Sequence, residues 1–399
     1  MKKVLVNCCR ILLALVFIFS GFVKAVDPLG TLYKIEDYLT VLHLGGILPD
    51  IIILALAVAL AMTEFCLGIF LLFAIRRRFT TRMVLLFMAV MTPLTLWLAL
   101  TNPISDCGCF GDAVVLTNWQ TLWKNVILLA AAIVVVCWPK EMFRFVSESN
   151  QWIVINYSAL FSLGISLWSL YDLPQFDFRP YHVGTNLRQG WNDMMEGHES
   201  PYADFFIERA DDGSDITEEV LADSSYTFLL VATRLEEADD SRLDLINELY
   251  EYSLEQGYGF YCLTASMEAG QEQWRDMTGA EYPFCWTDAI VLKTIIRSNP
   301  GLLLLHDGII VQKWSHNNLP VIEPAMATKP LWQLPYGTMP VNSIPGKIAK
   351  ILLWFVLPLL LLTIADRLWT WTKWVRRKRK TTKDEAQTSQ THADTDEQH

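Results

Sequence analysis

The chain has 399 residues, of which 52% are hydrophobic and only 19% are charged. Soluble proteins carry about 25% charged residues, so this composition excludes an ordinary soluble protein. The net charge is −11, and the Lys and Arg residues lie in short clusters beside apolar runs instead of forming a basic face. That distribution argues against a nucleic-acid partner. It predicts a chain with a membrane part and an acidic, water-soluble part.

Apolar runs long enough to span a membrane occur six times. A transmembrane helix needs about 20 apolar residues, because the hydrocarbon core is about 30 Å thick. The predicted spans are 8–26, 49–75, 82–101, 121–138, 152–171 and 347–368. Every second connection between them is basic, as expected on the cytoplasmic side. The sequence therefore predicts a multi-pass protein of a bacterial inner membrane, with both termini in the cytoplasm and residues 172–346 in the periplasm.

The region between spans five and six alternates strands and helices. The predicted elements are strands at 226–232 and 259–265, helices at 240–256, 269–278 and 288–297, and a hairpin at 302–314. This order predicts an α/β fold over residues 202–320 and resembles the thioredoxin superfamily, particularly its membrane-tethered thiol-disulfide branch. The resemblance implies that Pro300, just before the hairpin, matches the family's cis proline, which faces the active cysteines.

The active-site motif of that family is missing. The family places Cys-x-x-Cys just after the first central strand, where a helix N-terminus lowers the thiol pKa. Residues 233–237 read Thr-Arg-Leu-Glu-Glu at this position. We therefore expect the domain to bind or scaffold a partner instead of cycling a dithiol.

The predicted fold class is an α-helical integral membrane bundle, made of a four-helix core and two further transmembrane helices, with an inserted α/β thioredoxin-like soluble domain. The tail after Lys380 lacks large apolar residues and is predicted to be disordered. The predicted segments are a four-helix membrane domain at 1–140, a fifth helix at 141–171, a periplasmic linker at 172–201, the thioredoxin-like domain at 202–320, a second linker at 321–346, a sixth helix at 347–372, and a basic then acidic cytoplasmic tail at 373–399.

The first 140 residues carry motifs that resemble those of a known family. These are Phe19-Ser20-Gly21-Phe22-Val23-Lys24-Ala25 before Asp27-Pro28, then Lys34-Ile35-Glu36, Tyr38-Leu39, Glu64 and Gly68, and Cys107-Gly108-Cys109-Phe110-Gly111. They resemble the DoxX/MauE family of small four-helix membrane proteins, and the whole arrangement looks like DoxX-type proteins of the Bacteroidetes. The resemblance implies thiol-disulfide or quinone-linked redox chemistry and the maturation of disulfide-rich periplasmic proteins.

Cys107 and Cys109 are the candidate catalytic pair. A Cys-x-Cys disulfide closes a very small ring, and the resulting strain makes it easy to reduce. Asp106 and Asp112 flank the pair, and their negative charge is expected to raise the thiol pKa and weaken the nucleophile. A structural bridge and a metal site remain alternatives, although the predicted periplasmic face shows no His-rich stretch to complete a metal site. A quinone is the candidate electron acceptor, and no other cofactor is indicated.

Glu64 lies near the middle of the second predicted span, where an ionisable group is costly and therefore a functional candidate. Its alternative role is a structural hydrogen bond made by a protonated acid. We expect Lys24 or Asn125 to be its partner. Snorkelling of the side chains to the membrane surface would explain Lys24 and Arg10 at opposite ends of the first span.

Two cysteines, Cys262 and Cys285, lie in apolar stretches of the soluble region. Buried free thiols are the favoured interpretation, and a disulfide between them is the alternative.

Three functions fit the sequence. The first is a thiol-disulfide or quinone-coupled redox protein whose soluble domain docks a periplasmic client. The second is a non-enzymatic, membrane-anchored assembly factor that binds a periplasmic partner. The third is a small-solute transporter built around Glu64. It ranks last, because the chain shows no inverted repeat or pair of broken helices.

Overall fold

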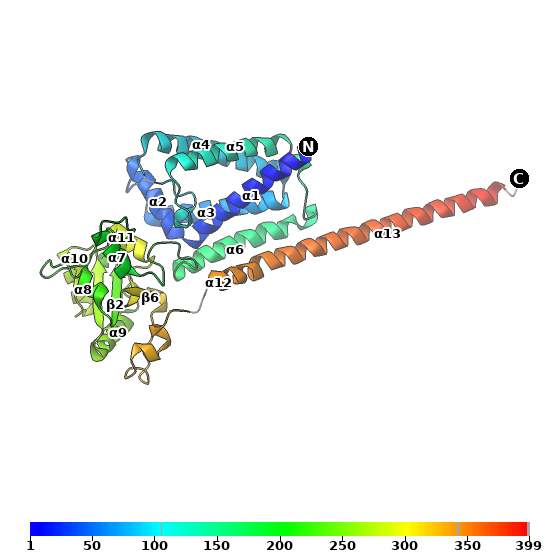
Figure 1. The fold of residues 1–399 in the computed structure, drawn as a ribbon. Coiled ribbons are helices and arrows are strands. Elements are labelled where there is room, and N and C mark those ends of the chain that lie inside the picture. The colour runs from blue at the N-terminus through cyan, green and yellow to red at the C-terminus, as the bar shows by residue number, and fades with distance from the viewer. Residues whose placement is uncertain (105, 341–343, 397–399) are drawn as a thin grey trace.

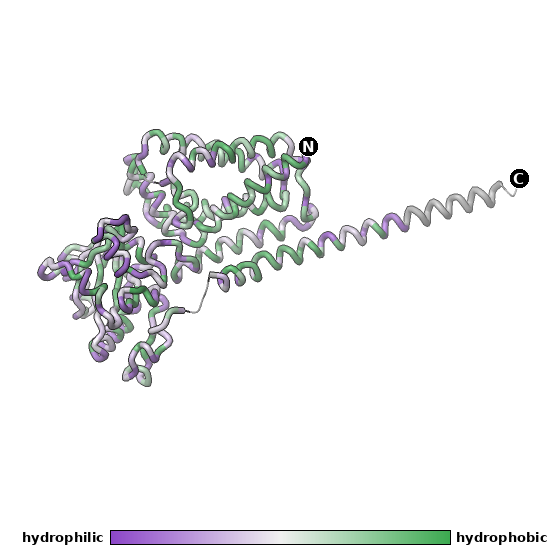
Figure 2. The backbone as a smooth tube through the Cα atoms, viewed as in Figure 1, coloured by the Kyte–Doolittle hydropathy of each residue, from purple (hydrophilic) through white to green (hydrophobic). Residues whose placement is uncertain are grey.

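The computed structural model describes residues 1–104, 106–340 and 344–396. A helical bundle forms one part, an α/β domain lies at one end of it, and the C-terminal helix extends beyond the other end (Figure 1). Hydrophobic residues run along the bundle helices (Figure 2). Within the described residues, six helices are long and apolar enough to cross a membrane, at Lys2–Val26, Asp50–Phe73, Arg77–Thr101, Asn118–Cys137, Glu148–Tyr171 and Pro345–Arg379. They agree with the six predicted spans.

Four of these helices form the membrane core. They are α1 (Lys2–Val26), α3 (Asp50–Phe73), α4 (Arg77–Thr101) and α5 (Asn118–Cys137). The α1 and α3 helices pack closely because glycines remove side chains at their crossing. A Cβ atom at Gly21 would lie 2.2 Å from the Phe65 backbone nitrogen, and one at Gly68 would lie 2.6 Å from the Ile18 nitrogen. Small residues of this kind allow two membrane helices to approach each other.

The segment between α1 and α3 forms a helix, α2 (Pro28–Val41), whereas the sequence predicted no element between the spans 8–26 and 49–75. The Asp27 carboxylate accepts a hydrogen bond from the Gly30 nitrogen at 2.9 Å and caps its N-terminus, and Pro28 occupies the first turn. Both residues favour a helix start. Leu32 packs α2 against Ile53 of α3. The segment was missed because, at 14 residues, it is too short to be a membrane span.

Two further helices lie beside the core. The α6 helix (Gln151–Tyr171) packs on α1 and α3, and Phe161 of α6 stacks on Phe355, with ring centroids 4.2 Å apart. Phe355 lies in a π-helical turn (Leu352–Val356) between α12 (Ile344–Ile351) and α13 (Leu357–Asp396). In the described part of the predicted disordered tail, α13 continues as a helix to Asp396. The Lys, Glu, Gln and Ala residues of this stretch are good helix formers.

The soluble domain is built on one mixed sheet with strand order β1-β4-β3-β2-β5-β6. The strands are β1 (Glu208–Arg209), β2 (Tyr226–Ala232), β3 (Gly259–Thr264), β4 (Phe284–Trp286), β5 (Gly301–His306) and β6 (Ile309–Ser315). The β2, β3 and β4 strands are parallel, and β5 and β6 form an antiparallel hairpin beside β2. The helices around the sheet are α7 (Leu187–Met195), α8 (Thr217–Ala222), α9 (Leu243–Gln256), α10 (Glu268–Thr278) and α11 (Ala289–Ile295). This is the predicted thioredoxin-like fold.

The sheet is covered on both faces, so every residue of β2 is buried. Continuous apolar runs are typical of strands covered on both sides. Both predicted linkers contribute to the core. Tyr181 and Leu187, from 172–201, pack on one face, while Leu331 and Leu334, from 321–346, pack on the other.

The structure also decides three details of the soluble domain. The Asn299–Pro300 peptide is cis, as the resemblance implied. Cys262 and Cys285 are both free and fully buried, and they belong to the cores on opposite faces of the sheet. The alternative of a disulfide between them is therefore excluded.

Candidate functional site

Cys107 and Cys109 lie in the connection between α4 and α5, with their Sγ atoms 3.0 Å apart. Both are free thiols, and Cys107 is buried. Gly108 has a φ of +65°, a left-handed conformation that glycine adopts without the strain a side chain would cause. This local turn accompanies the contact between the two sulfurs.

Side chains from α1 and α2 hold the backbone of this loop. Ser20 Oγ and Lys24 Nζ both donate to the Cys109 carbonyl, at 2.6 and 2.8 Å, and the Tyr38 hydroxyl donates to the Cys107 carbonyl at 3.0 Å. Ser20 and Lys24 are one helical turn apart, which places them on the same face of α1. The cysteine pair is therefore anchored from two sides by the membrane domain.

Glu64 of α3 contacts the two α1 side chains that hold the cysteine loop. Its Oε2 atom is 2.8 Å from Lys24 Nζ. It is also 2.5 Å from Ser20 Oγ, whose single proton is shared between this carboxylate and the Cys109 carbonyl. Lys24 and Glu64 are both buried. The pairing with Lys24 agrees with one of the two predicted partners.

Other predictions for charged and polar side chains in the spans are wrong. Asn125 donates to Thr95 Oγ1 at 3.2 Å and is not the partner of Glu64. Arg10 and Lys24 are both buried instead of snorkelling to the surface. Arg10 donates to the Phe143 carbonyl. In each case, a nearby hydrogen-bond acceptor gives the polar or charged side chain a partner inside the protein.

The two aspartates beside the cysteines each face a cation. Lys34 Nζ lies 2.6 Å from Asp106 Oδ1, and Arg297 Nη2 lies 3.3 Å from Asp112 Oδ2. Their negative charges are thus partly compensated. The prediction that they raise the pKa of both thiols does not hold for Cys109.

The two thiols have opposite pKa shifts. The hydrogen bond from Cys107 lowers the pKa of Cys109, and the charges of Lys124 and Lys24 act in the same direction, against burial and the charge of Glu64. The hydrogen bond to Cys109 raises the pKa of Cys107, and burial raises it further. When the pair loses one proton, Cys109 carries the negative charge and Cys107 keeps its proton.

A cavity of about 560 Å³ opens beside the pair, between the membrane domain and the soluble domain. Polar groups line it near the cysteines, including Lys24, Tyr38 and Glu64. Its apolar lining includes Leu60, Met91, Leu94, Ile104, Phe176 and Phe178. An apolar wall with a few convergent polar groups is typical of a site for a small ring-shaped ligand. These residues fit the headgroup of a quinone.

Arg297 of the soluble domain reaches the membrane domain at the edge of this cavity. Its guanidinium lies 3.0 Å from Asp27 Oδ2 as well as 3.3 Å from Asp112, and only 7% of its side chain is exposed. Although burial opposes ionisation, the charges of Arg297 and Arg179 hold the pKa of Asp27 below its usual value. The arginine therefore joins α2 and the cysteine loop to the soluble domain.

Further contacts join the soluble domain to α2. Lys293 Nζ lies 4.3 Å from the centre of the Tyr33 ring, in a cation–π contact. Burial raises the pKa of Glu36, while the charges of Lys293 and Arg234 oppose that rise. Arg234 lies at the position of the missing Cys-x-x-Cys. Pro300 follows Arg297 by three residues, so the loop that carries it borders the same contact.

Several residues of this site were not predicted as functional. Ser20 and Tyr38 were part of the family motif, and the four-residue spacing of Ser20 and Lys24 could have indicated a shared face. Arg297 had no local signal, because its partners are distant in the sequence. The same applies to Lys124, whose charge lowers the pKa of Cys109 from the neighbouring span.

Comparison with known proteins supports the family resemblance of the membrane domain. Residues 2–138 match the family described as Methylamine utilisation protein MauE. The match confirms the predicted resemblance over this part of the chain. Together with the six apolar helices and the inserted sheet, it defines a multi-pass membrane protein with a MauE-like domain and a thioredoxin-like domain. No curated protein matches the chain.

Among the solved structures similar to part of this chain is one of a thioredoxin-like protein. It is a solution structure of a Bacteroides thetaiotaomicron protein described as a protein disulfide isomerase. The sequences are 16% identical, the match covers 29% of this chain and 77% of that chain, and the TM-score is 0.24. A likeness at this level carries no argument about function. The thioredoxin-like assignment rests on the strand order described above.

Proposed function

We propose that this protein is a membrane thiol-disulfide redox protein that cycles Cys107 and Cys109 between dithiol and disulfide. The observation that carries the proposal is the 3.0 Å contact between their Sγ atoms beside a cavity at the junction of the two domains. The lowered pKa of Cys109 supports it, because the thiolate is the form that reacts. In this proposal, the junction faces the periplasm of a bacterial inner membrane, where disulfides form.

The proposed cycle moves two electrons and two protons in each half. In the first half, a client dithiol reduces the Cys107–Cys109 disulfide: a sulfur–sulfur bond forms in the client, the bond between the two cysteines breaks, and both cysteines become thiols. In the second half, the pair is oxidised again and its electrons and protons pass to an acceptor. A quinone bound in the cavity would supply that acceptor.

The chain's own residues have defined parts in this cycle. Cys109 carries the thiolate that gives up electrons. Lys24 and Ser20 hold the Cys109 carbonyl, and the Lys24–Glu64 pair lies next to it as a group that can take up and return protons. The soluble domain lacks a Cys-x-x-Cys motif. We therefore assign it to binding the client and covering the cavity.

Thiol trapping in intact cells tests the proposal. Wild-type protein is expected to trap as a mixture in which Cys107 and Cys109 are both labelled or both protected. The protected fraction should fall when quinone is depleted, because oxidation then has no acceptor. Cys107→Ser and Cys109→Ser should each abolish the protected form. Cys8→Ser removes an exposed cysteine at the opposite end of α1 and should leave the mixture unchanged.

Two results would contradict the cycle. The pair could stay fully oxidised whether or not quinone is present, which would make it a structural bridge. It could instead stay fully reduced, which would make it idle. Either result would favour the second candidate function, an assembly factor that binds a periplasmic partner. That alternative is supported by the sequence Thr-Arg-Leu-Glu-Glu at 233–237, where catalytic members of the superfamily carry cysteines.

A further inference from the structure

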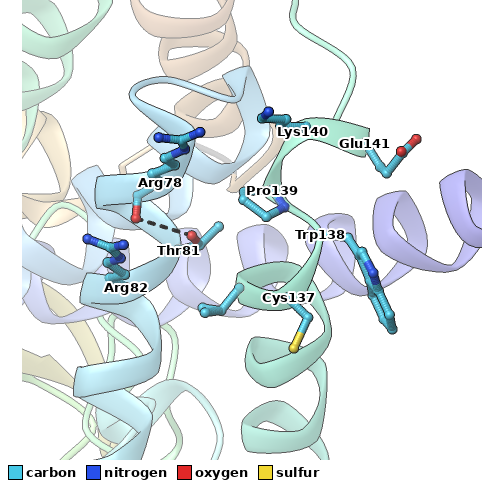
Figure 3. Close-up of a pocket in the computed structure, with 9 residues that line it drawn as sticks. Arg78, Thr81, Arg82, Cys137, Trp138, Pro139, Lys140 and Glu141 are labelled. Carbon is cyan, nitrogen blue, oxygen red and sulfur yellow. Dashed lines mark hydrogen bonds between the residues drawn. The ribbon is translucent and has the colours of Figure 1, made fainter.

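We infer that the end of the membrane domain opposite the cysteine pair holds a binding site for the phosphate group of an anionic lipid. A pocket of about 450 Å³ lies there, between the start of α4 and the end of α5. Its lining includes three cationic side chains, Arg78, Arg82 and Lys140 (Figure 3). This site is independent of the proposed redox function.

The three cations are available to a ligand. In the part of the chain that the structure describes, Arg78, Arg82 and Lys140 form no ion pair, and all three are exposed. The carboxylate in the lining belongs to Glu141, which points away from α4 in Figure 3. The pocket therefore has an uncompensated positive charge, and arginine side chains bind phosphate oxygens through paired N–H groups.

The wall of the pocket is supported from within the protein. The neighbouring Arg77 guanidinium donates to the Lys140 carbonyl at 2.9 Å and ties the loop after α5 to the start of α4. Arg78 and Arg82 lie one helical turn apart on α4, so they share a face of that helix. These features place cationic side chains from two separate segments around one pocket.

The position of the pocket favours a lipid over a soluble anion. It lies at the ends of two membrane helices, where lipid headgroups are located, and its lining also includes the apolar Val136, Cys137 and Pro139. Trp138 follows α5 at the same level, as tryptophans do at membrane interfaces. Basic pockets between membrane helices bind anionic headgroups. A phosphate group could bind the cations while its acyl chains run along the helices.

Native mass spectrometry of the purified full-length chain in detergent tests this inference. Dioctanoyl phosphatidylglycerol, dioctanoyl phosphatidylcholine and inorganic phosphate are titrated separately. We expect the anionic lipid to bind about tenfold more tightly than the zwitterionic one. Both carry the phosphate, but the choline of the zwitterionic lipid adds a positive charge that the three cationic side chains repel. The Arg78→Gln/Arg82→Gln variant should lose about the same factor. The Arg376→Gln/Arg379→Gln variant removes equal charge from exposed positions on α13 and should bind as wild type does.

The titration with inorganic phosphate shows whether the site binds a lipid phosphate or free phosphate. If inorganic phosphate displaces the anionic lipid at similar concentrations, the site takes free phosphate and the lipid assignment fails. Equal binding of the two lipids, or unchanged binding by the Arg78/Arg82 variant, would overturn the site altogether. Lys140→Gln changes a single exposed side chain, so its loss of affinity supports the site even if the double variant fails to fold.

Discussion

Cys109 differs from an ordinary cysteine in the groups around its sulfur. The thiol of Cys107 donates to it, and two lysines from different helices add positive charge. Burial and Glu64 act in the opposite direction but do not cancel these effects. At neutral pH, Cys109 is therefore the more nucleophilic member of the pair, since its thiolate forms at lower pH than that of a free thiol.

The first residue-scale prediction concerns the pH dependence of alkylation. In the reduced protein, the rate of iodoacetamide reaction at Cys109 should rise with pH around a midpoint below the ordinary thiol value of about 8.5. Cys107→Ala removes the hydrogen-bond donor, so the midpoint should move upward. Peptide mass spectrometry of timed samples measures both, with exposed Cys8 as internal reference. A midpoint equal to that of Cys8 in the wild type would contradict the lowered pKa.

The second residue-scale prediction concerns the buried Lys24–Glu64 pair. Lys24→Met leaves a carboxylate without its cation and should destabilise the protein by about 3–5 kcal/mol. The Lys24→Met/Glu64→Leu double variant removes both charges and should be less destabilised than the sum of the single changes. Thermal melting in detergent measures the differences. Arg209→Gln, which breaks the exposed Arg209–Asp211 pair, should melt as the wild type does, because solvent screens that pair. Additive losses in the double variant would show that the two groups do not interact.

At the scale of elements, the crossing of α1 and α3 determines the site. Lys24 and Ser20 come from α1 and Glu64 from α3, so their contact depends on how closely the two helices approach. Gly21, next to Ser20, permits this approach, since its missing side chain leaves room for the backbone of α3. The packing glycine and the functional side chains therefore form one unit.

We expect Gly21→Leu to separate α1 from α3 and to disrupt the site. A side chain at this position would meet backbone atoms, which cannot move aside as the end of a flexible side chain can. The yield of monodisperse protein in size-exclusion chromatography should fall sharply, and the remaining protein should melt at lower temperature. Gly164→Leu is the matched control, because a Cβ there, on α6, would meet no described atom within 4 Å. Equal behaviour of the two variants would show that the close crossing is not required.

At the scale of the whole molecule, Arg297 links the two domains. One guanidinium contacts carboxylates that precede α2 and follow the cysteine loop, which are far apart in the chain. The arginine side chain is only 7% exposed, and its loss leaves two carboxylates near each other without the cation that they share. The soluble domain should then be held less firmly over the cavity.

Arg297→Gln should therefore loosen the docking of the soluble domain without unfolding it. Hydrogen exchange is expected to increase in α2 and α11, which face each other across the contact, and to stay unchanged in the central strands β2 and β3. Arg188→Gln breaks the exposed Arg188–Asp307 pair and should leave exchange in α2 as in the wild type. If α2 of the Arg297→Gln variant exchanged at the same rate as α2 of the wild type, other contacts would hold the domains together.

A further whole-molecule prediction is the orientation in the membrane. With Cys8, Cys9, Cys107, Cys109 and Cys137 replaced by serine, a membrane-impermeant maleimide should label Ser214→Cys in intact cells from the periplasmic side. A cysteine inserted after Lys380 should react only after the membrane is permeabilised. The physical reason is the clustering of basic residues in every second connection. Labelling of the second probe in intact cells would contradict this orientation.

Local patterns in the sequence predicted a large part of this protein. Apolar runs of span length mark the membrane helices, because a helix in lipid must satisfy its own backbone hydrogen bonds. The apolar run of β2 and the turn at Asp307-Gly308 likewise depend on neighbours in the chain. The spacing of Cys107 and Cys109 placed two thiols together for the same reason. The helix α2 was missed because, at 14 residues, it is too short to be a membrane span.

Only the tertiary structure decided which distant groups meet. Glu64 had two candidate partners, and the close crossing of α1 and α3 selected Lys24 while Asn125 turned to Thr95. Cys262 and Cys285 lie near each other on adjacent strands, yet strand pleating sends their side chains to opposite faces. Arg297 reaches Asp27 across the two domains. Sequence periodicity describes the neighbours of a residue along its own helix or strand, whereas contacts of this kind depend on how separate elements pack.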